Sequence, residues 1–238
     1  MIQLAIETSI RDFSICLRIG QQTFQNRCET PEARASANLL PQIDAALRQA
    51  NRRPDEVEAI SISIGPGSFT GLRLGVATAK TMAWALDCPI YSVPSHAVIA
   101  WQAAQTLLSE PASKTRQIAA VIDAQRGQWF SQVFELDGKG DFAPREPFSL
   151  VDPQTFLNSL ENPTLVSGPG LQRWHQKLKK NTPFELTEPQ HWTPRASSVA
   201  ELVCRRTDNA SPVDAMQLVP VYGRKSAAEE KLLAGELK

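Results

Sequence analysis

The residues whose types and spacing most resemble a chemical site lie in the glycine-rich stretch GPGSFTGLR, from Gly65 to Arg73. A glycine-rich turn ahead of a helix binds phosphate when its spacing matches the Walker loop or the dinucleotide pattern G-x-G-x-x-G. In a Walker loop the second glycine is followed by lysine, but here Leu72 follows Gly71. The dinucleotide pattern requires glycine at the position of Thr70. Neither motif is present, so the stretch predicts a tight structural turn.

Other candidate nucleophiles and metal ligands form no recognisable site. Ser95 and His96 are neighbours, but no aspartate is placed to orient the ring, as a hydrolase triad requires. A peptidase would need a serine that a fluorophosphonate labels covalently. The three histidines, His96, His175 and His191, are too scattered for a zinc site. The sequence therefore predicts neither a catalytic residue nor a metal ligand.

The elements around the glycine turn are predicted to be a buried strand and a buried helix. Residues 57–64 are an apolar run, and Ser68 or Thr70 can cap the helix that follows, over residues 71–86. A helix that is apolar nearly all round is buried on more than one side, so we expect this one to face a second chain as well as its own sheet. Its small residues would allow close approach; they are Gly71, Gly75, Ala77, Ala79, Ala83 and Ala85.

The first half of the chain reads as three strands followed by alternating helices and strands. Alternation of apolar and polar residues over 13–19 indicates a strand with one covered face, and helical spacing from 36 to 50 indicates an amphipathic helix that contains Pro41. The expected order is strands 2–7, 13–19 and 23–29, helix 36–50, strand 57–64, helix 71–86, strand 89–93 and helix 95–108.

The second half repeats this order after a polar seam at 109–116. We expect strands 117–123, 128–136 and 147–151, helix 153–160, strand 164–166, helix 171–180, helix 196–206 and an extended segment 216–222. The predicted division is a first lobe (1–110) carrying the dimerisation helices, a second lobe (111–223) and a tail (224–238). Two tandem βββαβα units are the α/β layout of the actin, hexokinase and heat-shock ATPase superfamily, which is ribonuclease H-like.

Composition excludes some classes of function. Lys plus Arg and Asp plus Glu both number 25, so no net charge would draw a polyanion. The five tryptophans (84, 101, 129, 174 and 192) do not cluster, and we expect them to pack inside. No apolar run approaches the ~20 residues of a membrane span, and the chain enters a strand directly after Met1. We therefore expect a cytoplasmic protein without membrane contact.

Four segments together resemble the TsaB (YeaZ) family: LAIETS, IGPGSFTGLRLG, VIDAQRGQWF and PVYGRK. The resemblance implies a part in making N6-threonylcarbamoyladenosine (t6A) in tRNAs that read ANN codons. It implies a non-catalytic, scaffold-like paralogue of TsaD, the partner that holds the transferase site, with TsaE as a small ATPase. ATP and metal are then expected in TsaD and TsaE, and tRNA contact only through them. TsaE with ATP would bind the assembled pair.

The superfamily also supplies an alternative, an autonomous ATPase or small-molecule kinase that uses Glu7 and Asp123 to organise Mg²⁺. The turn after Glu7 has no glycine and carries bulky Ile10 and Arg11, so phosphate would meet side chains. The paired histidines that hold metal in TsaD have no counterpart near Ala35.

The resulting hypothesis is an interface formed by helices 36–50 and 71–86. Pairing with the equivalent helices of TsaD would cover their apolar surface, and a homodimer would cover it when TsaD is absent. Arginine at Val76 or Ala79 is expected to abolish association while the monomer stays folded. The predicted interface residues are Leu39, Leu40, Ile43, Leu72, Arg73, Val76, Ala79, Lys80 and Ala83.

Overall fold

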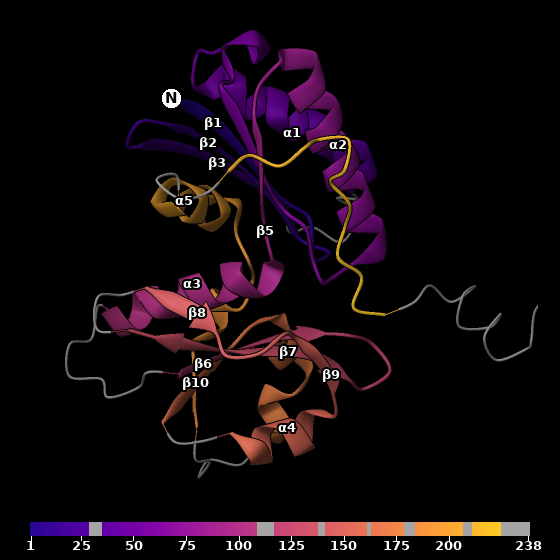
Figure 1. Cartoon of the computed structure of the whole chain (residues 1–238), viewed down its shortest axis with the longest axis vertical. Coiled ribbons are helices and arrows are strands. Elements are labelled where there is room, and N and C mark those ends of the chain that lie inside the picture. Colours follow the sequence, from indigo (N-terminus) through magenta and orange to yellow (C-terminus); the bar gives the residue numbers. More distant parts are fainter. Residues whose placement is uncertain are drawn as a thin grey trace, which may run out of the picture.

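A computed structural model shows two α/β lobes, one above the other (Figure 1). The structure describes residues 1–28, 35–108, 117–137, 141–160, 163–178, 184–206 and 211–224. The seam at 109–116 and most of the tail lie outside the described residues.

The first lobe is a five-stranded sheet in the order β3-β2-β1-β4-β5. β1 pairs antiparallel with β2 and parallel with β4, as a βββαβ order requires. Helices α1 and α2 lie side by side on one face, and their apolar stripes join the sheet in one core (Figure 1). The elements are β1 (Ile2–Glu7), β2 (Phe13–Ile19), β3 (Gln22–Cys28), α1 (Ala35–Gln49), β4 (Ala59–Ser63), α2 (Phe69–Leu86), β5 (Ile90–Val93) and α3 (Ser95–Leu108).

The second lobe repeats the strand order in a sheet that runs β11-β10-β6-β7-β8, with β9 also paired to β7. A short helix, α4, covers its outer face in a core of its own. The elements are β6 (Gln117–Asp123), β7 (Trp129–Leu136), β8 (Phe142–Pro144), β9 (Ser149–Val151), α4 (Pro153–Ser159), β10 (Thr164–Ser167), β11 (Glu185–Leu186) and α5 (Ala196–Arg206).

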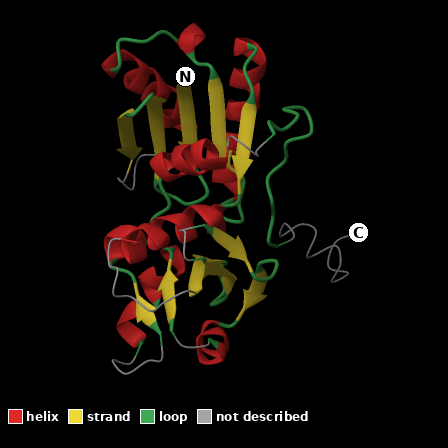
Figure 2. Cartoon of the chain, turned by 60° about the vertical axis from the view of Figure 1, so that its left-hand side comes forward, coloured by secondary structure: helices red, strands yellow, loops and turns green. Residues whose placement is uncertain are grey.

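Two helices exchanged between the halves fill the space between the sheets (Figure 2). α3, from the first half, packs on β6 and β7, while α5, from the second half, packs on β1, β2 and β4. One hydrophobic cluster runs from Ala5 and Cys16 through both helices to Phe130. The lobes therefore share a core, and a cut in the sequence near residue 110 separates the two sheets but not the helices that cover them.

Most predicted elements are present, with one clear difference in the second lobe. The predicted helix at 171–180 is wrong: the described part of this segment forms only short 3-10 helices, Pro169–Arg173 and His175–Lys177. The predicted third strand at 147–151 is present as the shorter β9, and β8 is a further strand that was not predicted. Pro41 lies inside α1. The two halves thus form the two repeated α/β units that the sequence predicts.

The last described residues return to the first lobe. Residues 213–224, which we call the clasp, form an extended segment that runs along α2 (Figure 1). No helix in the described parts of the chain combines the length and apolarity needed to cross a membrane.

Candidate partner-binding face and interlobe cleft

The first candidate carboxylate, Glu7, is sealed inside the protein at the end of β1. Its side chain is fully buried, and the Ser9 amide donates to Oε1 at 2.6 Å. The other oxygen, Oε2, is buried with no hydrogen-bond partner among the described residues. Burial raises the pKa of Glu7, and the hydrogen bonds from Ser9 oppose this only in part. A carboxylate in this position is a poor ligand for a hydrated Mg²⁺ ion.

The glycines of the GPGSFTGLR stretch explain how this seal forms. Ser68 caps α2 by accepting from the Gly71 amide at 3.3 Å, as the sequence predicts. A Cβ at Gly71 would overlap the Thr8 carbonyl oxygen, and one at Gly67 would overlap the Ser9 carbonyl oxygen. The glycines thus let the first turn of α2 rest directly on the chain that follows Glu7. They create close packing where a phosphate-binding loop would leave space.

The second carboxylate, Asp123, reaches a cleft between the lobes. Its Oδ1 accepts from the Gln125 amide at 2.8 Å, and its Oδ2 lies 3.3 Å from Arg173. The cleft has a volume of about 890 Å³ and is lined by Asp123 but not by Glu7. The structure therefore does not bring the two predicted carboxylates together in one open site.

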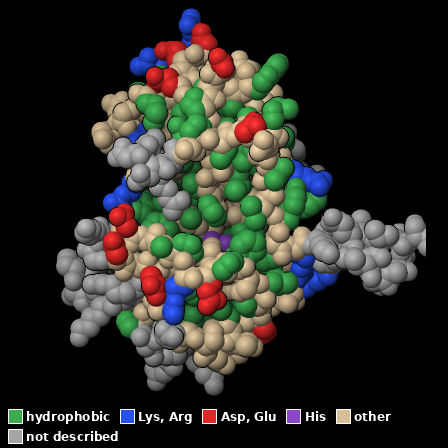
Figure 3. Space-filling view, viewed as in Figure 1, with side chains coloured by type: hydrophobic (Ala, Val, Ile, Leu, Met, Phe, Trp, Pro, Cys, Tyr) green, Lys and Arg blue, Asp and Glu red, His purple; other side chains and the backbone are tan. Residues whose placement is uncertain are grey.

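The clasp closes one side of this cleft and ties the lobes together. Lys80 donates to the carbonyl oxygens of Met216 at 3.1 Å and Leu218 at 3.0 Å. Arg73 donates to the Tyr222 hydroxyl at 3.0 Å and lies over the Phe69 ring. Further along, Arg224 donates to Gln128 of the second lobe. In Figure 3 apolar side chains gather where the two lobes meet.

The predicted interface residues divide into buried and accessible groups. Six belong to the core of the monomer, where each is at most 3% exposed; they are Leu39, Ile43, Leu72, Val76, Ala79 and Ala83. Arginine at Val76 or Ala79 would therefore disrupt the fold itself, and the expectation that the monomer survives it is wrong. Arg73 and Lys80 already bind the clasp. Leu40 remains, with 61% of its side chain exposed.

An exposed stripe on α2 was missed by the sequence analysis. Ala77, Thr81, Trp84 and Ala85 are exposed and lie on one side of the helix, because positions four and seven residues apart share a face. Trp84 is 78% exposed and does not pack inside as predicted, whereas Trp129 is buried. The spacing of these residues was visible in the sequence. We call these four residues, together with Leu40, the α1–α2 face.

Ser95 and His96 lie between the lobes and are fully buried. His96 Nε2 lies 3.1 Å from the Phe130 carbonyl oxygen, which can only accept, so Nε2 carries the proton. Nδ1 has no hydrogen-bond partner among the described residues. Burial lowers the pKa of His96 to about 4, despite the bond to Phe130. A peptide substrate could not reach this pair.

Fold and site together define a two-lobed α/β protein whose first-strand carboxylate is sealed beneath a helix. A family model described as "TsaD: tRNA N6-adenosine threonylcarbamoyltransferase" matches residues 29–198, and the chain belongs to that family.

The named relatives show which members of this family the chain resembles. The chain is similar to the tRNA threonylcarbamoyladenosine biosynthesis protein TsaB of Bacillus subtilis, at 28% identity over 99% of this chain and 100% of the relative. It is 29% identical to TsaB of Haemophilus influenzae over 96% of each chain. YeaZ of Pseudomonas aeruginosa has a similar structure, with a TM-score of 0.76, 22% identity and coverage of 93% of this chain and 99% of that chain. The resemblance to the TsaB (YeaZ) family is confirmed.

Proposed function

We propose that this chain takes part in t6A biosynthesis as a non-catalytic subunit that docks on TsaD and fixes its geometry. The names of its relatives place them in that pathway, and the family match is to the transferase itself. The proposal assigns catalysis to TsaD, ATP and metal to TsaD and TsaE, and tRNAs that read ANN codons to the assembled complex. Contact of this chain with tRNA is then indirect, and its place is the cytoplasm.

One observation carries the proposal: the first lobe combines a sealed carboxylate with an exposed apolar face. Glu7 is fully buried, while Trp84 and Leu40 on the neighbouring helices are 78% and 61% exposed. Large apolar side chains exposed next to small residues are typical of surfaces that another protein covers. The frame of an ATPase is thus kept, and its outer helices are available for contact.

The expected occupant of the α1–α2 face is TsaD, through its own equivalent helices. Partners of one fold can pair face to face in a pseudo-symmetric way, and the small side chains of Ala77, Thr81 and Ala85 would let the helices approach closely. A homodimer would use the same face when TsaD is absent. TsaE with ATP would bind the pair once it has formed.

Ala77→Arg tests this surface. Ala77 is exposed in the monomer, so arginine there should leave the fold intact and place an unpaired charge in the interface. We expect TsaD to bind at least about 100-fold more weakly, as expected for a desolvated and unpaired charge. Size-exclusion chromatography and calorimetry measure the association, and t6A formation with TsaD and TsaE measures the consequence.

Gln154→Arg, on the outer surface of α4, is the matched control. It adds the same charge to an exposed helical position of the other lobe and should bind TsaD as the wild type does. Wild-type association by Ala77→Arg would exclude the α1–α2 face as the docking surface. Reconstituted t6A formation that proceeds equally well without this chain would overturn the proposed role itself.

A further inference from the structure

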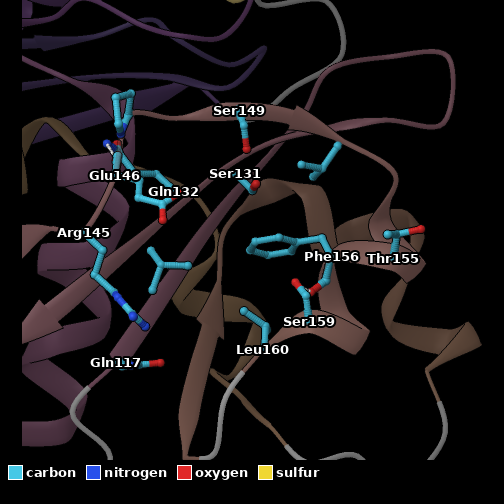
Figure 4. A pocket seen from close by; sticks show the side chains of 13 residues that line it. Gln117, Ser131, Gln132, Arg145, Glu146, Ser149, Thr155, Phe156, Ser159 and Leu160 are labelled. Atoms are coloured by element: carbon cyan, nitrogen blue, oxygen red, sulfur yellow. Dashed lines mark hydrogen bonds between the residues drawn. The ribbon is translucent and has the colours of Figure 1, made fainter.

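A second pocket, of about 390 Å³, opens beside α4 on the outer side of the second sheet (Figure 4). None of its lining residues also lines the interlobe cleft. Its volume falls in the range of small-molecule sites. The wall is formed by Gln117, Ser131, Gln132, Val133, Arg145, Glu146, Pro147, Ser149, Val151, Thr155, Phe156, Ser159 and Leu160.

Strand register arranges these residues in rows. Ser131, Val133 and Glu135 alternate along β7, so their side chains point to the same face. Ser149 of β9 lies opposite Ser131. The Arg145 amide bonds to the Val133 carbonyl oxygen at 2.9 Å, which places Arg145 beside the next row.

A buried hydroxyl marks one end of the pocket. Ser131 is 2% exposed, and its Oγ has no hydrogen-bond partner among the described residues. An unsatisfied buried hydroxyl destabilises the folded protein, so its retention favours a ligand that would complete the bond. Figure 4 shows the side chains of Ser131 and Ser149 close together at this end, near the Phe156 ring.

The other end carries a guanidinium and an amide. Arg145 Nε lies 3.3 Å from the Glu135 carboxylate, with 38% of the arginine side chain exposed. Gln117 lies opposite Glu135 in the register of β6 and β7, and Figure 4 shows Arg145 pointing toward it. Since Glu135 already balances part of the positive charge and Glu146 also lines the pocket, this end can accept at most a single carboxylate and not a doubly charged phosphate.

Apolar side chains separate the two polar ends. Val133, Val151, Phe156 and Leu160 all pack in the outer core of the second lobe and also border the pocket. Glu135 and Gln117 lie four residues along β7 from Ser131, which is ~13 Å. A carboxylate and a hydroxyl at the ends of a short aliphatic chain match this spacing, with a hydrogen bond of ~3 Å at each end.

We propose that this pocket binds a short aliphatic hydroxycarboxylic acid. Arg145 and Gln117 receive its carboxylate, the apolar residues contact its chain, and Ser131 bonds its far hydroxyl. None of the residues that line the pocket belongs to the α1–α2 face.

The probes are 5-hydroxypentanoate, pentanoate and pentan-1-ol, titrated into the full chain and followed by ¹⁵N NMR. We expect the hydroxy acid to bind with a Kd on the order of 1 mM, which is usual for so small a ligand. Pentanoate should bind several-fold more weakly, and the alcohol more weakly still. The shifted resonances should belong to residues of β7, β9 and α4.

Variants separate the two ends of the pocket. Arg145→Gln should weaken both acids by about 10-fold or more, because a hydrogen bond to a charged group is lost. Ser131→Ala should remove the preference for the hydroxy acid and leave pentanoate binding unchanged, without lowering the melting temperature. Arg48→Gln, which removes a similar exposed ion-paired arginine on α1, is the control and should bind as the wild type does. Absence of saturable shifts for both acids, shifts confined to other regions, or wild-type affinity of Arg145→Gln would overturn the proposal.

Discussion

The two lobes share a strand order but differ in what covers the outer face of each sheet. On the first lobe α1 has 15 residues and α2 has 18. On the second lobe α4 has 7 residues, and the described residues after β10 form 3-10 helices of 5 and 3 residues. Both lobes place Gly-Pro-Gly after the corresponding strand. The repeat is therefore kept in the strands and lost in the helices that cover the outer faces.

This difference separates the two proposed surfaces. The long helices of the first lobe bury the central strands of their sheet and still expose Trp84 and Leu40, which favours a partner. The shorter cover of the second lobe leaves a pocket beside α4, which favours a small ligand. The helices that cover each sheet, more than the sheet itself, determine what each lobe can contact.

Protonation of His96, which is buried between the lobes, is expected to have the largest effect on the free energy of unfolding. Its effect therefore tests how strongly the two lobes are joined. Its folded pKa of about 4 lies below its ordinary value of 6.5. The unfolded chain therefore binds more protons as the pH falls below about 6.5, and the free energy of unfolding decreases. Full protonation of the unfolded imidazole would remove about 3 kcal/mol, of which about 2 kcal/mol is lost between pH 7 and pH 5.

Urea unfolding at several pH values measures this loss, with His96→Gln for comparison. The variant keeps an N–H group for the Phe130 carbonyl oxygen but does not titrate, so the difference from the wild type isolates His96. Parallel pH profiles for the two proteins would show that His96 is not held neutral between the lobes.

Matched glycine substitutions sharpen the comparison of the two turns. A Cβ at Gly71 would overlap the Thr8 backbone, whereas one at Gly170 would lie 3.0 Å from the Trp129 side chain. Gly71→Ala should lower the free energy of unfolding by about 2 kcal/mol, because overpacking outweighs the gain in helix propensity. Gly170→Ala should cost less than about 1 kcal/mol, since a side chain can shift. Chemical denaturation checks both, and equal losses would contradict the tighter packing of α2.

Sequence reasoning succeeded where local pattern and packing agree. Alternation gave β2 its correct place, and helical spacing predicted α1 to within one residue of its observed bounds. It failed at 171–178, where the repeated order of elements in the two halves suggested a helix that the structure does not form. It also could not tell which side of α2 meets the sheet, because a helix of small apolar residues has no polar face to mark the solvent side. The clasp that holds Arg73 and Lys80 joins residues more than 130 positions apart, which no local pattern indicates.

The smallest expected effects come from the two carboxylates, and they also test the ATPase alternative. Glu7→Gln removes an acid whose pKa is raised by burial. The wild type loses stability as the pH rises from 4.5 through the raised pKa, whereas the amide does not, so the variant should equal or exceed the wild type at neutral pH. Asp123→Asn breaks a largely exposed ion pair with Arg173 and should cost at most about 1 kcal/mol.

Calorimetry with Mg-ATP on the same proteins tests the function of these carboxylates. Because Glu7 is sealed and Asp123 faces the cleft without it, we expect no micromolar binding and no turnover in the wild type, and hence no change in either variant. Tight Mg-ATP binding with turnover that both substitutions abolish would reverse this conclusion. It would mean that α2 moves away from the first strand in solution. The first lobe would then contribute Glu7 to a catalytic site, and α2 would not keep that carboxylate covered.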